Sequence, residues 1–186
     1  DSVKALVELA KSKPGHLTYA SPGSGSSPHL AGELFRVMAG IDITHVPYRG
    51  GPQAMTDLLA GRVALSFQSV SFSMPLAKAG KVKAIAVTGA TRSKVAPDLP
   101  TVAEFIPGYE ASTWYGIFVP TGTPAKIVAR LHDAIVATLL KSSVRDRLTA
   151  NGAEIVGDTS EHFAAAFKTD IAKWGRIVTA AGVRND

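Results

Sequence analysis

The chain of 186 residues contains no cysteine, which excludes disulfide bridges and thiolate metal sites. This absence says little about the cellular compartment, because many cytosolic proteins lack cysteine too. Long hydrophobic runs are also missing: no stretch approaches the roughly 20 consecutive apolar residues that a helix needs to span a bilayer. The chain opens on helix-like sequence, so we expect no signal peptide within it.

Charged and aromatic residues are sparse, at 19% and 7% of the chain, and the net charge is +5. The basic residues are scattered and do not alternate with aromatic ones, so no nucleic-acid partner is expected. No G-x-S-x-G elbow occurs that would present a nucleophilic serine. The histidines lack metal-ligand spacing, so we expect neither a metal nor a cofactor and interpret them as packing or surface residues: His16, His29, His45, His132 and His162.

Small residues dominate the stretch from Tyr19 to Leu30, which follows a predicted strand at 17–20. We expect a helix to open there, with Ser27 as its N-cap and Pro28 at its first position. Glycines let a backbone come close to a ligand, and the free N–H groups of a first helical turn favour a negative charge. The stretch is therefore either an anion-binding loop or a flexible surface turn.

The order strand, loop, helix repeats along the first half of the chain. Further strands are predicted at 43–46, 63–67 and 82–87, and the short helix after the third strand carries Pro75 near its start. This repetition predicts an α/β fold with a mainly parallel sheet and flanking helices. Because such sheets bind ligands beyond the carboxyl ends of their strands, the three loops should meet at one crevice.

The second half is predicted to begin with a strand at 113–119 and to contain a last short strand at 153–156. A long helix should start at Thr123-Pro124. The final helix ends at Gly182, and its apolar face carries Phe163, Phe167 and Trp174.

Several motifs resemble the substrate-binding proteins of tripartite tricarboxylate transporters, the Bug family. They lie at 17–35, 45–51 (His-Val-Pro-Tyr-Arg-Gly-Gly), 84–88, 98–104, 107–114 and 172–178, and so cover essentially the whole chain in order. The resemblance implies two α/β lobes, as in periplasmic binding proteins, with a ligand cleft between them. It also implies a periplasmic, non-enzymatic protein that captures a small organic carboxylate, such as a di- or tricarboxylate, for the membrane permease of such a transporter.

The resemblance further predicts how the chain is divided. Family members carry roughly another hundred residues at the start, which build most of the first lobe. Residues 1–112 would then form the second lobe, and 113–186 would return to the first. Without that partner surface, Phe163, Phe167 and Trp174 should be exposed, or buried against a second copy in a homodimer that exchanges the C-terminal segment.

The family holds its carboxylate with backbone amides and small hydroxyls at loop–helix junctions. Carried over to this chain, that arrangement predicts ligand contacts from the three loops and from one aromatic residue. The first loop contributes Ser21, Gly23, Ser24, Gly25, Ser26 and Ser27, and the second contributes Tyr48, Gly50 and Gly51. The third loop contributes Gln68 and Ser69, and Trp114 is the aromatic residue of the cleft. Two positions depart from the family pattern, where asparagine is common at Ser24 and aspartate or asparagine at Gln68. Because Gln68 is neutral, we expect a ligand without an amino group.

A nucleotide-binding α/β enzyme of the NAD type is the alternative. The run from Gly23 to Pro28 half-matches the G-x-G-x-x-G fingerprint, since it follows a strand and opens a helix. However, Pro28 replaces the third glycine, and Asp42 lies before the second strand instead of at its end.

Overall fold

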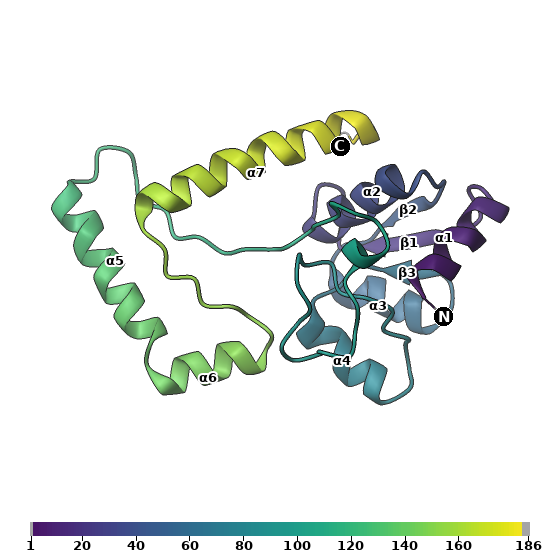
Figure 1. Ribbon diagram of the computed structural model, residues 1–186, viewed down its shortest axis with the longest axis horizontal. Helices are drawn as coiled ribbons and strands as arrows, with labels where there is room; N and C mark the ends of the chain where they lie inside the picture. Colours follow the sequence, from purple (N-terminus) through teal and green to yellow (C-terminus); the bar gives the residue numbers. More distant parts are fainter. Residues whose placement is uncertain (1, 184–186) are drawn as a thin grey trace.

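A three-stranded parallel sheet lies at the centre of the N-terminal lobe. The computed structural model describes residues 2–183. Asp1, the first residue of the predicted segment 1–112, and 184–186, the last residues of the predicted segment 113–186, lie outside the described residues. The strands are β1 (Thr18–Ser21), β2 (Thr44–Pro47) and β3 (Leu65–Ser66), in the order β2-β1-β3. Both pairings of β1 are parallel, so the predicted α/β fold with a parallel sheet and flanking helices is confirmed (Figure 1).

Four helices surround this sheet: α1 (Val3–Ser12), α2 (Ser27–Ala39), α3 (Gly51–Leu59) and α4 (Val70–Lys78). Alternate residues of β1 point to opposite faces. Tyr19 belongs to the core cluster that contains the inner face of α2, whereas Ala20 packs with Ala54 of α3. Helices α2 and α3 therefore cover opposite faces of the sheet.

The start of α2 was predicted to within one residue, whereas α4 begins well before Pro75. Helix α1 begins after its N-cap Ser2, whose Oγ accepts the Ala5 N–H at 3.1 Å. The N-cap of α2 is Ser26 instead of Ser27, because the extended backbone persists through Ser26 (φ −67°, ψ 155°). Pro75 lies in the interior of α4, not near its start.

The predicted fourth strand at 82–87 does not form. Within the described chain, this stretch contributes a single parallel bridge, between Val87 and Thr101. The Val87 N–H donates to Pro100 O at 2.9 Å, and Val87 O accepts the Val102 N–H at 2.9 Å. Its partner is thus the loop that leads into the short 3-10 helix η1 (Val102–Glu104), and no ladder with β3 develops.

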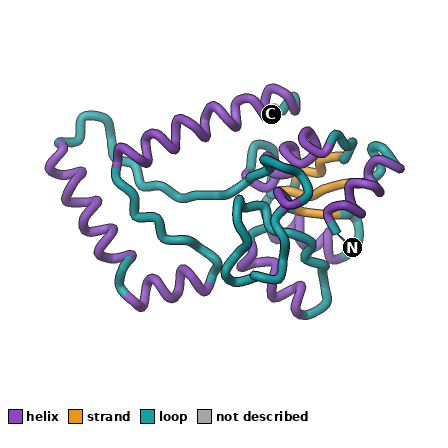
Figure 2. The backbone as a smooth tube through the Cα atoms, in the orientation of Figure 1, coloured by secondary structure: helices purple, strands orange, loops and turns teal. Residues whose placement is uncertain are grey.

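The C-terminal part leaves the lobe as an arm of three helices, α5 (Ala125–Leu139), α6 (Ser142–Ala150) and α7 (Ser160–Ala181). The predicted strands at 113–119 and 153–156 are wrong, and Figure 2 draws both stretches as loop. A strand needs a neighbour to satisfy its backbone, and no described segment pairs with either stretch. No described residue after Ala111 is fully buried.

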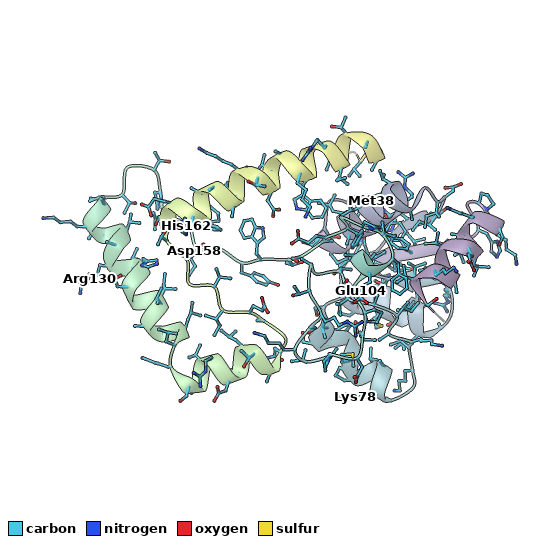
Figure 3. All side chains as sticks on the ribbon, viewed as in Figure 1. Met38, Lys78, Glu104, Arg130, Asp158 and His162 are labelled. Carbon is cyan, nitrogen blue, oxygen red and sulfur yellow. The ribbon has the colours of Figure 1, made fainter. Side chains whose placement is uncertain are left out.

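Helix α7 contacts the α5 region at its start and the N-terminal lobe toward its end. At its start, His162 Nδ1 lies 3.0 Å from Asp158 Oδ1 (Figure 3), and His132 of α5 contacts Asp158 O at 3.1 Å. Toward its end, α7 packs along α2, where Trp174 and Ile177 lie against the core of the lobe.

The three aromatic residues of α7 find partners within this chain. The Phe163 ring lies 5.3 Å from Trp114 and 5.4 Å from Phe118, and Phe167 contacts the same two rings. Phe163, Phe167 and Trp174 are accordingly half-buried. The expectation that they would be exposed is wrong, because Trp114, Phe118 and the core of the lobe partly cover them. Exchange of the C-terminal segment with a second copy stays a prediction.

Replacing Gly32 by alanine should destabilise the lobe by about 1–3 kcal/mol, the usual cost of overpacking a core. A Cβ at this position of α2 would lie 2.3 Å from Cε2 of the buried Tyr19 ring. The free energy of unfolding, measured by urea denaturation, tests this. Gly175→Ala in α7 is the matched control: its Cβ would meet nothing within 4 Å, so this change should be neutral or stabilise the helix by about 0.5–1 kcal/mol. Equal effects of the two substitutions would contradict the proposed contact.

Candidate functional site

Three helices begin at the carboxyl edge of the sheet. Helix α2 follows β1, α3 follows β2 and α4 follows β3, with connecting loops of a few residues each. The strand order β2-β1-β3 places the first loop between the other two. An edge of this kind, where connections leave in opposite directions, is the usual ligand position in α/β folds, and helix N-termini there favour anions.

The first loop uses part of its donors internally. The buried Ser21 Oγ accepts the Gly23 N–H at 3.1 Å and lies 3.0 Å from Gly23 O, which also accepts from Ser26 Oγ at 2.6 Å. The Gly25 N–H donates to His29 Nδ1 at 2.9 Å. Ser21, Gly23, Gly25 and Ser26 therefore shape the loop.

Other donors of the first loop remain available. Ser24 and Ser27 are exposed, and neither their N–H groups nor their hydroxyls have a hydrogen-bond partner within the described residues. These two serines lie on the outer side of the loop at the start of α2, so they can donate to a ligand.

The second loop is fastened to the first. The Tyr48 N–H donates to Ser21 O at 3.0 Å, and the Gly50 N–H donates to Pro22 O at 3.1 Å. The Tyr48 hydroxyl donates to Asp57 Oδ2 at 2.9 Å, so it is engaged with α3. Burial and this bond raise the pKa of Tyr48, and the bonds from Tyr48 and Arg62 lower the pKa of Asp57. At the first residue of α3, the Gly51 N–H has no partner among the described contacts.

The third loop is connected to the central strand β1 by two consecutive hydrogen bonds. Gln68 Nε2 donates to Ser66 Oγ at 2.9 Å, and Ser66 Oγ donates to Ala20 O at 2.9 Å. Ser69 is the N-cap of α4, and its Oγ lies 3.3 Å from Ser71 Oγ. The structure thus brings the predicted residues of all three loops to one edge.

Trp114 lies beside the first loop only. A cavity of about 230 Å³ separates the start of α2 from the arm, and it is lined by Ser27, Leu30, residues 111–114, Asp170 and Trp174. The Trp114 Nε1–H donates to the Asp170 carboxylate. Tyr48 and Gln68 are not among the lining residues, so Trp114 shares this cavity with Ser27 but not with the other two loops.

Two histidines beneath the first loop were missed as part of the site. The His29 and His45 rings stack with centroids 3.8 Å apart and planes 12° apart. Burial lowers the pKa of both, that of His45 to about 4, so both are neutral at pH 7. His29 was interpreted as a packing or surface residue, but its Nδ1 also accepts the Gly25 N–H. The sequence signal was the spacing of four residues between Gly25 and a histidine at a helix start.

A buried polar chain continues below these rings. The Tyr19 hydroxyl donates to Glu33 Oε1 at 2.6 Å, and Glu33 pairs with Arg36 at 2.7 Å. Burial, together with Glu33, raises the pKa of Tyr19. Arg36 in turn reaches Ala181 O at the end of α7.

The described residues at this edge do not form a serine–histidine–carboxylate triad. Ser21 Oγ lies 2.7 Å from His45 Nε2, but Ser21 is fully buried, and among the described residues no carboxylate contacts the His45 ring. Residues 2–183 contain no group of three acidic or histidine side chains that could hold a metal ion. Among the described helices, none has both the length and the apolar character needed to cross a membrane.

Comparison with known proteins identifies the family of the chain. The profile of the "Tripartite tricarboxylate transporter family receptor" family, TctC, matches residues 1–183. A protein of the tcbD-tcbE intergenic region of Pseudomonas sp. (strain P51) is 36% identical over 178 residues, which are 95% of this chain and 53% of that protein. Protein BugT of Bordetella pertussis is 32% identical over 99% of this chain and 57% of its own length. The chain thus spans about half the length of these curated relatives.

Solved structures show the same similarity. R. palustris Rpa4515 with adipate has a TM-score of 0.87 and 37% identity, over 98% of this chain and 61% of that one. The periplasmic binding protein BugD has a TM-score of 0.81 and 30% identity, over 100% of this chain and 63% of that one. MatC from Rhodopseudomonas palustris with bound malate has a TM-score of 0.78 and 31% identity, over 96% of this chain and 62% of that one. The family and these neighbours are substrate-binding proteins, not enzymes. The chain therefore belongs to the TctC family, the receptor proteins of tripartite tricarboxylate transporters.

Proposed function

We propose that this chain is the ligand-capturing part of a periplasmic solute-binding protein that delivers a small organic carboxylate to the permease of a tripartite tricarboxylate transporter. The observation that carries this proposal is the set of three helix starts at one edge of the sheet, where the N–H groups of Ser24, Ser27 and Gly51 have no hydrogen-bond partner within residues 2–183. Neighbouring structures hold adipate and malate, which are dicarboxylates.

Neutral donors suit a carboxylate at this edge. Each carboxylate oxygen can accept more than one N–H or O–H bond, and bonds to a charged acceptor are about twice as strong as neutral ones. The dipoles of α2, α3 and α4 add a partial positive charge at their starts. Ligand binding at this edge thus needs no arginine clamp.

The proposed ligand cleft also involves a second lobe, and this depends on how the chain is divided between the two lobes. We propose that 1–112 form the second lobe of a two-lobed protein and that 113–186 return to the first lobe, with Trp114 at the crossing. The absence of any fully buried residue from Ser112 to Val183 supports this, because that segment has no core of its own. Closure of two such lobes around the ligand is a known mode of capture.

A thermal-shift screen of the full-length protein against adipate, malate, succinate, citrate and NAD tests the proposed ligand class. One of the acids, at about 100 times its dissociation constant, should stabilise the folded protein by roughly 2.7 kcal/mol. NAD should have no effect, because the Gly23 and Gly25 N–H groups that a dinucleotide would need are bonded within the loop. A shift with NAD and with none of the acids would overturn the proposal in favour of a nucleotide site.

The loops also predict selection against an ammonium group. Gln68 is neutral, and the Asp57 carboxylate beside Tyr48 is already held by Tyr48 and Arg62. Succinate should therefore bind more tightly than aspartate, which differs from it by one amino group. Calorimetric titration of both ligands measures the ratio, and tighter binding of aspartate would contradict the assignment of the third loop.

Gly25→Ala should weaken carboxylate binding about 5- to 30-fold. Gly25 has φ +76°, and a left-handed conformation costs other residues roughly 1–2 kcal/mol, so the loop should relax away from the ligand. Gly61→Ala is the matched control: Gly61 has φ +69° and open space around it, but it follows the far end of α3. Both variants should lose stability, and Gly25→Ala alone should lose affinity in a calorimetric titration. Equal affinities would show that the first loop does not bind the ligand.

A further inference from the structure

The hydrogen bond between Gly25 and His29 defines the protonation state of the histidine. A backbone N–H can donate only, so His29 Nδ1, 2.9 Å from Gly25 N, must carry a free lone pair. His29 is therefore a neutral imidazole with its hydrogen on Nε2. It is also nearly inaccessible, with 5% of its surface exposed, which favours the neutral form.

The bond shapes the part of the loop that faces the ligand. Gly25 lies between Ser24 and Ser27, the two residues of the first loop whose donors are unengaged within the described chain. The ring that holds Gly25 is in turn held by its stack on His45, whose Nε2 lies 2.7 Å from the buried Ser21 Oγ. The two imidazoles thus connect both ends of the loop to the lobe.

We propose that His29 is a positioning residue for the ligand loop and that its protonation switches carboxylate capture off in acid. This inference rests on the proposed function, since it concerns the same loop. A proton on Nδ1 would place a donor opposite the Gly25 N–H donor. The two would repel, Gly25 would move away, and the Ser24 and Ser27 donors would lose their alignment.

The groups around His29 determine in which direction a change of pH alters its protonation. The titratable groups around the two rings are Tyr19 of β1, which bonds Glu33, and Glu33 of α2, which is paired with Arg36. Burial lowers the pKa of His29 and outweighs the opposing effect of Glu33. His29 is therefore neutral at pH 7 and gains its proton as the pH falls below the usual histidine range. A second charge on the stacked His45 would be still less favourable.

Three variants of the full-length protein separate positioning from packing. His29→Asn places an amide oxygen near the position of Nδ1 and cannot titrate, whereas His29→Phe keeps a ring but has no acceptor. His16→Asn is the control, because His16 is exposed at the opposite edge of the sheet. Calorimetric titration with adipate and with malate, at pH 7.5 and 5.0, gives the affinities. The ratio of parent to variant cancels the protonation of the probe itself.

We expect His29→Asn to bind within about threefold of the parent at pH 7.5 and His29→Phe to bind at least tenfold more weakly. Between pH 7.5 and 5.0 the parent and His16→Asn should lose affinity relative to His29→Asn, and for one linked proton that loss is at most tenfold per pH unit below the pKa of His29. Identical pH profiles for the parent and His29→Asn would overturn this inference and leave the proposed function intact. Failure of the parent to bind any carboxylate would overturn both.

The nitrogen resonances of His29 in the protein without a probe give a second, ligand-independent reading. An unprotonated Nδ1 at pH 7.5, with a Gly25 amide signal that shifts as the ring titrates, supports the inference. A protonated Nδ1 at pH 7.5, or a Gly25 signal that ignores the titration, would overturn it.

Discussion

The contact between Tyr19 and α2 is the interaction on which the lobe depends. Tyr19 lies on the central strand and is fully buried, and its ring meets α2 at Gly32, where no side chain larger than hydrogen fits. Its hydroxyl bonds Glu33 one residue further along the same helix. Because α2 is held so closely to β1, the loop between them has little freedom, and the start of α2 is fixed at the edge where the site lies.

The site combines donors that shape the loop with donors that face outward. Ser21, Gly23 and Gly25 use their polar groups to curl the backbone, while Ser24 and Ser27 leave theirs available within the described chain. This division matters physically, since a ligand held by preorganised neutral donors avoids the cost of ordering long charged side chains. The supports beneath the loop are therefore as much a part of recognition as the groups that touch the ligand.

The C-terminal segment has no core of its own and leaves large apolar side chains exposed. Its aromatic residues gather around Trp114 and Phe118, yet Tyr115 is 96% exposed and Ile117 70% exposed. Large apolar side chains of this kind usually mark a surface that another element covers. The chain spans about half the length of the relatives named above, which fits our proposal that 113–186 belong with a lobe lying outside this sequence.

Local signals in the sequence were enough for the parallel α/β order, the start of α2 to within one residue, the family, and the clustering of three loops at one edge. These features depend on glycine, proline and capping residues and on strand–loop–helix repetition, which act over a few residues. Tertiary structure alone decided the rest. The stretches 82–87 and 113–119 have strand-like sequences but no ladder, because a strand exists only where a second segment pairs with it. Likewise, the role of His29 became visible only when the fold brought its ring to Gly25 and stacked it on a histidine from another strand.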